Sequence, residues 1–123
     1  MTLRQRLGAL GEAKAAELLR SNGYRIVAQN HRCRTGEVDL IAERGDLLVF
    51  VEVRTRASAA FGRPEETVDA RKQRRVVAAA LDYLAQRRGP RRGIRFDVVA
   101  VTDGPRGPTL QHFENAFDAG GHP

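Results

Sequence analysis

The chain has 123 residues, of which 41% are hydrophobic and 29% charged, a composition typical of a single globular domain. Lys and Arg (21) outnumber Asp and Glu (15), and the net charge of +6 favours a polyanionic partner such as nucleic acid. Apolar runs fall far short of the roughly 20 residues that cross a bilayer, and a single cysteine, Cys33, excludes an internal disulfide and a Cys-rich zinc site. We expect a soluble, cytoplasmic protein without a membrane partner, with one domain over residues 1–118 and a flexible tail at 119–123.

The first part of the chain predicts a helix and a short strand. The segment 2–21 lacks proline and is rich in Ala, Leu and Glu, which favours a helix, and Asn22-Gly23 is suited to end it. An apolar stripe at three- and four-residue steps should pack this helix on the domain. Its members are Leu3, Leu7, Leu10, Ala15, Leu18 and Leu19. A strand at 24–28 and a polar loop at 29–36 should follow.

Two strands at 37–43 and 47–54 form the clearest local pattern, an antiparallel hairpin. Both runs are rich in Val, Leu and Ile, and Arg44-Gly45-Asp46 between them is typical of a turn. A loop at 57–64, a helix at 65–88 and strands at 94–102 and 109–113 complete the order αβββαββ. This order predicts a three-layer α/β fold, with a mixed central sheet flanked by helices and the hairpin near one edge of the sheet.

The hairpin register brings two carboxylates together. With a two-residue turn at 45–46, strand alternation places Asp39 directly opposite Glu52, with Glu37 and Arg54 beside them. The opposite face should form the core. It carries Val38, Leu40, Val49, Val51 and Val53. Because directly opposed like charges repel, the pair calls for a positive partner, and Mg²⁺ accepts one or two carboxylates completed by water and phosphate.

A second interpretation of this pattern is a solvated strand face, on which Glu52 pairs with Arg54 or Arg56 across water. The surroundings of Glu52 favour the first interpretation. It interrupts a run, 47–53, whose other six residues are apolar, as in a central strand that is buried on both faces. An unpartnered carboxylate is costly there.

Several short motifs are spread over residues 8–101. They are Gly8-x-x-Gly11-Glu12, Gly23-Tyr24, Asn30-x-Arg32, Gly36-Glu37-x-Asp39-Leu40-Ile41-Ala42, Phe50-Val51-Glu52-Val53, Lys72 and Phe96-Asp97-Val98. In these motifs the chain resembles the YraN family of small uncharacterised bacterial proteins. That family is similar to archaeal Holliday-junction resolvases and shares the restriction-endonuclease-like fold, whose PD-(D/E)xK site lies on such a hairpin.

The resemblance implies a site and an activity. Asp39 and Glu52 would be metal-binding and catalytic carboxylates, Glu12 on the first helix would complete the site, and the residue two beyond Glu52 would hold the attacking water and the scissile phosphate. The cofactor would be Mg²⁺ or Mn²⁺. The implied function is a metal-dependent endonuclease that hydrolyses phosphodiester bonds in structured, possibly branched, DNA. A homodimer is expected on the same ground.

The sequence departs from the family pattern at Arg54, where the motif has lysine. Arginine cannot lose its proton near neutral pH, so it can bind phosphate but cannot act as a general base. Three accounts stay open: the metal alone activates the water, Lys72 takes over the lysine's role, or the protein binds nucleic acid without cutting it. Lys72 is one of only two lysines among 21 basic residues, which makes its retention notable. The alternative for Lys72 is an exposed helix lysine.

The remaining basic residues predict a phosphate-binding surface with salt-dependent binding. The candidate nucleic-acid contacts are Arg32, Arg34, Arg56, Arg71, Arg74 and Arg75. Because tryptophan is absent, recognition should follow backbone shape. Rival functions are a catalytically impaired nucleic-acid-binding module and an adaptor for an acidic protein.

Three further polar residues are expected to have lesser roles. Asp97 should form a structural salt bridge with an arginine, and Glu37 should orient Arg54. His31 should be a surface residue of the polar loop.

Overall fold

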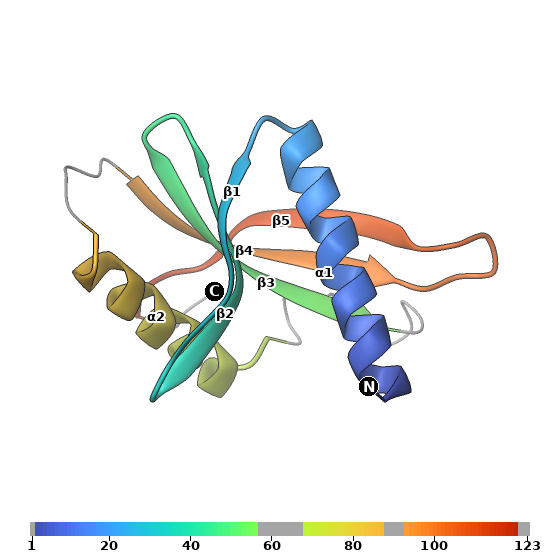
Figure 1. Ribbon diagram of the computed structural model, residues 1–123, viewed down its shortest axis with the longest axis horizontal. Coiled ribbons are helices and arrows are strands. Elements are labelled where there is room, and N and C mark those ends of the chain that lie inside the picture. The colour runs from blue at the N-terminus through green and yellow to red at the C-terminus, as the bar shows by residue number, and fades with distance from the viewer. Residues whose placement is uncertain (1, 57–67, 88–92, 121–123) are drawn as a thin grey trace.

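The structure is a computed structural model that describes residues 2–56, 68–87 and 93–120. Two helices and five strands follow one another as α1 (Leu3–Ser21), β1 (Arg25–Cys33), β2 (Gly36–Arg44), β3 (Leu47–Arg56), α2 (Ala70–Ala85), β4 (Gly93–Thr102) and β5 (Thr109–Phe117). The strands form one sheet in the order β1-β2-β3-β4-β5 (Figure 1). Pairing is parallel between β3 and β4 and antiparallel elsewhere. The predicted element order and the mixed sheet are confirmed.

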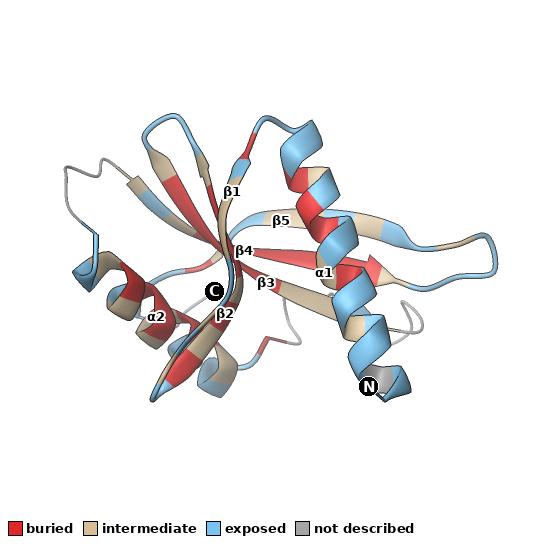
Figure 2. Ribbon diagram, viewed as in Figure 1, coloured by how far each residue is buried: buried red, intermediate tan, exposed pale blue. Residues whose placement is uncertain are grey.

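The sheet is covered by one helix on each face, which gives three layers. On the α1 side, Ala15 and Leu19 pack against Leu40, Val49 and Val51 and their neighbours. On the α2 side, a second core cluster includes Ile41, Phe50, Val76, Ala80 and Phe96. Buried residues therefore alternate between the two faces of the middle strands, where Figure 2 shows the buried colour concentrated. The predicted α/β three-layer fold is confirmed.

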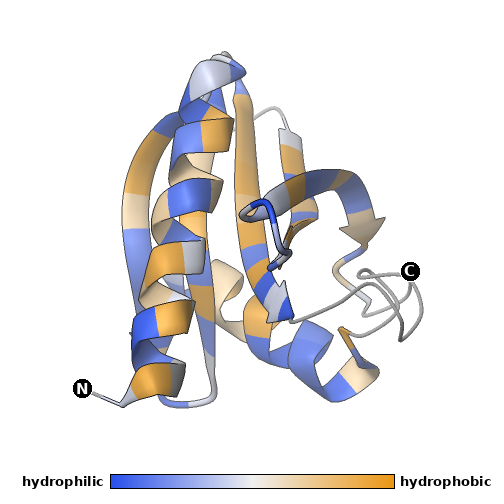
Figure 3. Cartoon of the chain, turned by 90° about the vertical axis from the view of Figure 1, so that its right-hand side faces the viewer, coloured by the Kyte–Doolittle hydropathy of each residue, from blue (hydrophilic) through white to orange (hydrophobic). Residues whose placement is uncertain are grey.

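Helix α1 is only half covered. Its C-terminal half contributes Ala15 and Leu19 to the core, but Leu3, Leu7 and Leu10 are exposed. Figure 3 shows apolar residues among hydrophilic ones near the N-terminal end of this helix. The predicted apolar stripe therefore packs on the core only in the second half of the helix, whereas Leu7 and Leu10 line a hollow beside Thr55 of β3 and Val101 of β4. Among the described residues, no helix is long and apolar enough to cross a membrane.

Helix α2 starts later than predicted. Asp69 is its N-cap, and the Asp69 side chain accepts a hydrogen bond from the Lys72 backbone N at 2.8 Å. Val68, just before the cap, is buried in the α2-side core but is not helical. A continuous helix from 65 through Val68 and Asp69 is therefore wrong, because Asp69 caps α2 from outside the helix. The predicted loop at 57–64 lies outside the described residues.

The two edge strands are longer than predicted. Most of the expected loop at 29–36 belongs to β1, and β5 continues past residue 113 to Phe117. Both strands are polar and largely exposed, and each contains an asparagine with positive φ, Asn30 at 51° and Asn115 at 53°. His31 lies in β1 and its Nε2 is 2.8 Å from Asp82 Oδ2 on α2, so it is not the loop surface residue that we expected.

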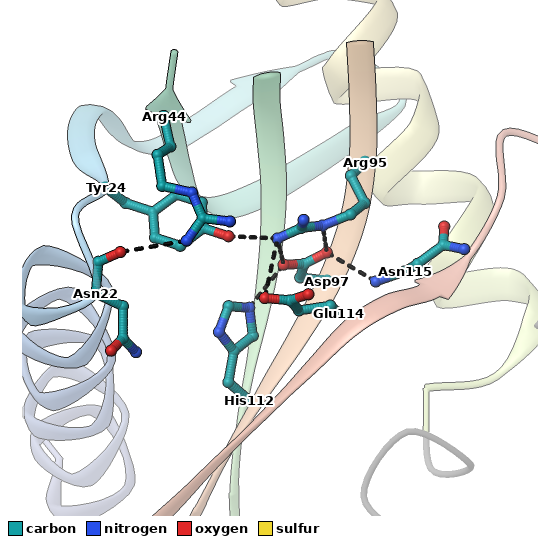
Figure 4. Close-up of polar contacts among 8 residues, drawn as sticks. All are labelled: Asn22, Tyr24, Arg44, Arg95, Asp97, His112, Glu114 and Asn115. Carbon is teal, nitrogen blue, oxygen red and sulfur yellow. Dashed lines mark hydrogen bonds and ion pairs between the residues drawn. The ribbon is translucent and has the colours of Figure 1, made fainter. Parts of the chain in front are cut away.

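A polar network connects β4 to β5 and to Tyr24, which follows α1 (Figure 4). Asp97 is fully buried, and Arg95 donates to both of its carboxylate oxygens, each at 2.8 Å. His112 Nε2 lies 2.6 Å from Asp97 Oδ2, and the Asn115 backbone N donates to Oδ1 at 3.0 Å. Arg95 also donates to the Tyr24 hydroxyl at 2.6 Å. The predicted structural salt bridge of Asp97 is confirmed.

Gly36 lets α2 approach β2 closely. A Cβ at Gly36 would lie 1.9 Å from the Arg75 carbonyl oxygen, a distance that no side chain tolerates. A Cβ at Gly8 on α1 would meet nothing within 4 Å. The absence of a side chain at Gly36 therefore sets the position of α2, and with it the position of Lys72, against the hairpin.

We predict that Gly36→Ala lowers the free energy of unfolding by at least about 2 kcal/mol, because the backbone of α2 must move. Gly8→Ala is the matched control and should stabilise the protein by up to about 1 kcal/mol, since alanine favours helix over glycine. Urea unfolding of both variants measures the difference. Equal effects at the two positions would show that α2 does not depend on contact with Gly36.

We predict that Asp97→Asn lowers the free energy of unfolding by about 3 kcal/mol at pH 7, because Arg95 loses a buried partner. Burial alone would raise the pKa of Asp97, but hydrogen bonds from His112 and Arg95 outweigh it, and the pKa lies below the ordinary 3.8. The contribution of a lowered carboxylate pKa is complete above the unfolded value and is lost as the pH falls through the folded value. Urea unfolding at pH 7, 4 and 3 should show the gap between wild type and variant narrowing on acidification, and a constant gap would contradict this account.

Candidate active site

The hairpin has the predicted register. Arg44 pairs with Leu47 across Gly45, whose φ of 61° suits a tight turn, and the ladder runs back to Leu40 opposite Val51. Asp39 and Glu52 are the next positions in this register, just beyond the last pair. The turn length therefore determines that these two carboxyl groups lie together at the end of the β2–β3 ladder.

Asp39 is held where the ladder ends. Its Oδ2 accepts a hydrogen bond from the Val53 backbone N at 2.7 Å, so the side chain takes a position that a strand carbonyl would otherwise occupy. Alternation in β2 also breaks here, because Val38 packs on the α2 side whereas Leu40 packs on the α1 side. The prediction that Val38 and Leu40 share one face is wrong, since β2 is no longer constrained by pairing with β3 beyond Leu40.

Glu52 is the buried carboxyl group of the site. It lies on β3, the middle strand of five, and only 3% of its surface is exposed. The prediction that the hairpin carboxylates lie near one edge of the sheet is therefore wrong. Burial, followed by proton sharing with Asp39 and by the Asp39 charge, raises the pKa of Glu52 to about 9 against the opposing effect of Lys72. Within the described part of the chain, Glu52 Oε2 accepts no hydrogen bond.

Lys72 brings a positive charge to this carboxyl group from α2. Its Nζ lies 3.3 Å from Glu52 Oε2 and 3.5 Å from Glu37 Oε1. The contact with Glu52 is an ion pair, and among the described residues Oε2 has no hydrogen-bond partner. Glu37 in turn pairs with Arg32, whose Nε is 3.3 Å from Oε2. Lys72 is therefore not an exposed helix lysine, and the described ion pairs of Glu37 are with Lys72 and Arg32, not with Arg54.

Glu12 approaches the site from α1. Its pKa is raised by burial first and by the charge of Asp39 next, while Asn30 and Arg32 oppose the shift. Asp39 thus interacts with Glu12 on one side and with Glu52 on the other. Over residues 2–56, 68–87 and 93–120, no group of three or more His, Cys, Asp or Glu side chains is arranged to hold a metal ion.

The donor atoms nevertheless suit a hard cation. Asp39 and Glu52 supply carboxylate oxygens, and Mg²⁺ is often held by one or two carboxylates with water and phosphate oxygens filling its octahedron. Buried Oε2 of Glu52 accepts no hydrogen bond in the described part of the structure, so it can bind such an ion once Lys72, whose Nζ is 3.3 Å away, moves aside. The two hairpin carboxylates fit a Mg²⁺ or Mn²⁺ ion, whereas a closed three-carboxylate centre with Glu12 is not assembled.

A cationic hollow of about 360 Å³ opens beside the carboxylates. It is lined by Arg54, Asp69, Arg71, Lys72 and Arg75. Lys72 belongs both to this hollow and to the carboxylate cluster, so it connects the two. Asp69 is absent from the residues predicted for the site, although an aspartate directly before an amphipathic segment is typical of a helix N-cap.

The other predicted phosphate contacts do not line this hollow. Arg32 pairs with Glu37, and Arg56 Nε donates to Thr102 Oγ1 at 3.2 Å. Arg34 and Arg74 are exposed. The six arginines predicted to bind nucleic acid are therefore divided between the hollow, which contains Arg71 and Arg75, and the surrounding surface.

A family described as "Uncharacterised protein family UPF0102" matches residues 11–101. A UPF0102 protein of Anaeromyxobacter dehalogenans is 56% identical over 120 residues, which cover 98% of this chain and 90% of that protein. A UPF0102 protein of Moorella thermoacetica is 52% identical over 98 residues, which cover 80% of this chain and 82% of that protein.

Two solved structures are similar at a much lower level. The crystal structure of SSO0001 has a TM-score of 0.45 and 14% identity, with 91% of this chain and 52% of that chain covered. Pyrococcus furiosus SfsA in complex with Ca²⁺ has a TM-score of 0.36 and 15% identity, with 90% and 63% covered. This chain thus spans about half of the first protein and under two thirds of the second.

We predict that Glu52→Gln raises the free energy of unfolding by roughly 2 kcal/mol at pH 8, because Glu52 must take up a proton or be buried charged on folding, whereas glutamine is neutral in both states. A raised carboxyl pKa contributes stability that is complete below the unfolded value, 4.5, and is lost as the pH rises toward the folded value, about 9. The gain should therefore be large at pH 8 and small at pH 5 in urea unfolding. Glu17→Gln on the exposed side of α1 is the control and should show no such pH dependence; a destabilised Glu52→Gln at pH 8 would contradict the prediction.

Proposed function

This chain belongs to the UPF0102 family, also called the YraN family, and from that premise we propose that it is a metal-dependent endonuclease that hydrolyses phosphodiester bonds in DNA. The observation that carries the proposal is the buried Glu52 carboxyl group, which lies beside Asp39 and has an oxygen without a hydrogen bond among the described residues. Such a group lowers the stability of the fold at neutral pH, so it is not explained by folding alone. A role as ligand of a cation explains it.

The carboxylates of Asp39 and Glu52 would hold Mg²⁺ or Mn²⁺, and Glu12 would act from α1 through its interaction with Asp39. When bound, the metal supplies Lewis-acid polarisation of a phosphate oxygen and lowers the pKa of water. Asp39 is oriented for this role by the Val53 backbone N, which fixes one of its oxygens at 2.7 Å.

The cationic hollow supports a phosphate substrate. Arg54, Arg71 and Arg75 line it next to Lys72, and arginine forms paired hydrogen bonds to phosphate oxygens. Arg54, which remains protonated, would bind the phosphate and stabilise charge without accepting a proton. Contacts of this kind read the backbone and not the bases, so binding should weaken steeply with salt. The resemblance to resolvases directs the proposal to branched DNA cleaved by a homodimer.

A nucleic-acid-binding module without cleavage is the second candidate function. Arg54 favours it, because a general base at this position is excluded. The position of Lys72, 3.3 Å from Glu52, favours the nuclease, because an amine remains beside the carboxylates despite the loss of the motif lysine. The two functions differ in whether product forms under Mg²⁺ or Mn²⁺.

We predict metal-dependent cleavage of a labelled four-way DNA junction that falls at least about 100-fold in Asp39→Asn and in Glu52→Gln, because the metal loses a ligand. Denaturing gels with Mg²⁺, Mn²⁺ or chelator provide the measurement, with duplex, flap and single-stranded DNA as comparison substrates. Glu17→Gln should cleave at the wild-type rate. The predicted stability gain of Glu52→Gln separates lost chemistry from lost folding.

Two results would reject the nuclease. Tight, salt-sensitive binding of the junction with no product under either metal would select the binding module. Cleavage that persists undiminished in Asp39→Asn would place the chemistry elsewhere in the preparation or in the chain.

A further inference from the structure

The position of Lys72 is fixed at its backbone and open at its side chain. The backbone N is bound by the Asp69 cap at 2.8 Å, and α2 is set against β2 by the close contact of Gly36 with Arg75. The Lys72 side chain is 28% exposed and lines the cationic hollow while its Nζ lies between Glu52 and Glu37. A long, flexible stem at a fixed origin can therefore carry the ammonium group to either place.

When it contacts Glu52, the Lys72 ammonium group occupies the position that a metal ion bound to Glu52 would need. Nζ is 3.3 Å from Oε2, and a Mg²⁺ ligand lies about 2.1 Å from the ion, so a metal on Oε2 would lie within a few ångströms of Nζ. Two positive centres at that separation in a largely buried site repel each other strongly. The metal and the ammonium group therefore compete for Glu52.

The hollow becomes more favourable for the displaced ammonium group when an anion binds in it. Of the other described residues that line it, three are the cations Arg54, Arg71 and Arg75, and the carboxylate of the fourth, Asp69, already accepts from the Lys72 backbone N. A nucleic-acid phosphate in the hollow adds an anionic partner, since its oxygens accept from ammonium as well as guanidinium groups. Phosphate binding thus draws Lys72 away from Glu52.

We propose that Lys72 is a mobile cation that couples the two ligands of the site: its ammonium group contacts Glu52 in the metal-free protein and moves onto a bound phosphate, so that nucleic acid promotes metal binding. The inference rests on the proposed function and adds a form of regulation to it. By linkage, the metal must promote nucleic-acid binding by the same factor. The protein alone would then hold its metal weakly and become loaded on its substrate.

The test measures Ca²⁺ binding to the full chain by isothermal titration calorimetry, with and without a four-way DNA junction whose integrity is checked on gels. For the wild type we expect at least about fivefold tighter Ca²⁺ binding with the junction. For Lys72→Met we expect at least about fivefold tighter Ca²⁺ binding without DNA, and a coupling reduced by the same factor. Lys72→Arg retains the positive charge and should keep the weak Ca²⁺ binding of the wild type.

The other lysine provides a matched control. Lys14 lies on α1 and pairs with Glu17 at 3.6 Å, so Lys14→Met removes the same charge from the chain without touching the carboxylates, and its Ca²⁺ binding should equal that of the wild type. If Lys72→Met binds Ca²⁺ no more tightly than wild type, or retains the full coupling, the inference is wrong. If wild type binds Ca²⁺ without coupling while cleavage still requires Asp39, the nuclease proposal survives alone. Absence of both Ca²⁺ binding and cleavage rejects both.

Discussion

The carboxyl group of Glu52 lies on the middle strand of the sheet, between core clusters that cover both faces. Neighbouring polar groups offset only part of the cost of its burial. Asp39 shares the proton of Glu52, Lys72 supplies a positive charge, and Glu37 also pairs with Lys72. None of these contacts gives Oε2 a hydrogen bond among the described residues. The region therefore carries a free-energy cost that a bound cation would offset, and Arg95 with Asp97 shows that the same sheet can satisfy a buried carboxylate fully.

The carboxylate pair could be predicted from the sequence because a two-residue turn determines every later pairing in a hairpin. Once Arg44 faces Leu47, the positions of Asp39 and Glu52 follow by counting. The contact of Lys72 with Glu52 could not be predicted in this way. It depends on how closely α2 approaches β2, and that distance is set by a glycine contact to the Arg75 carbonyl oxygen, which has no periodic signature.

The boundaries of the two edge strands were wrong for one physical reason. In β1 and β5, one edge has no neighbouring strand and much of the surface faces solvent, so polar residues are tolerated and the alternation that marks a strand is lost. Asn30 and Asn115, with positive φ, disturb the pattern further. In α1, the helical pattern is continuous, but only the second half of the helix contributes to the core, which leaves Leu3 and Leu7 exposed. The periodicity of a sequence predicts a helix or strand, but it does not show how much of that element the rest of the fold covers.

The parallel pairing of β3 with β4 has a consequence for how the protein matures. Parallel neighbours need a crossover connection, and here α2, with Lys72, lies within it. The hairpin closes locally, so two mutually repelling carboxylates meet early in synthesis, before the crossover has delivered their counter-charge. Assembly of the carboxylate–lysine cluster is thereby tied to completion of the sheet. A nascent or partly unfolded chain holds Asp39 and Glu52 without the amine, and the full cluster exists only in the finished fold.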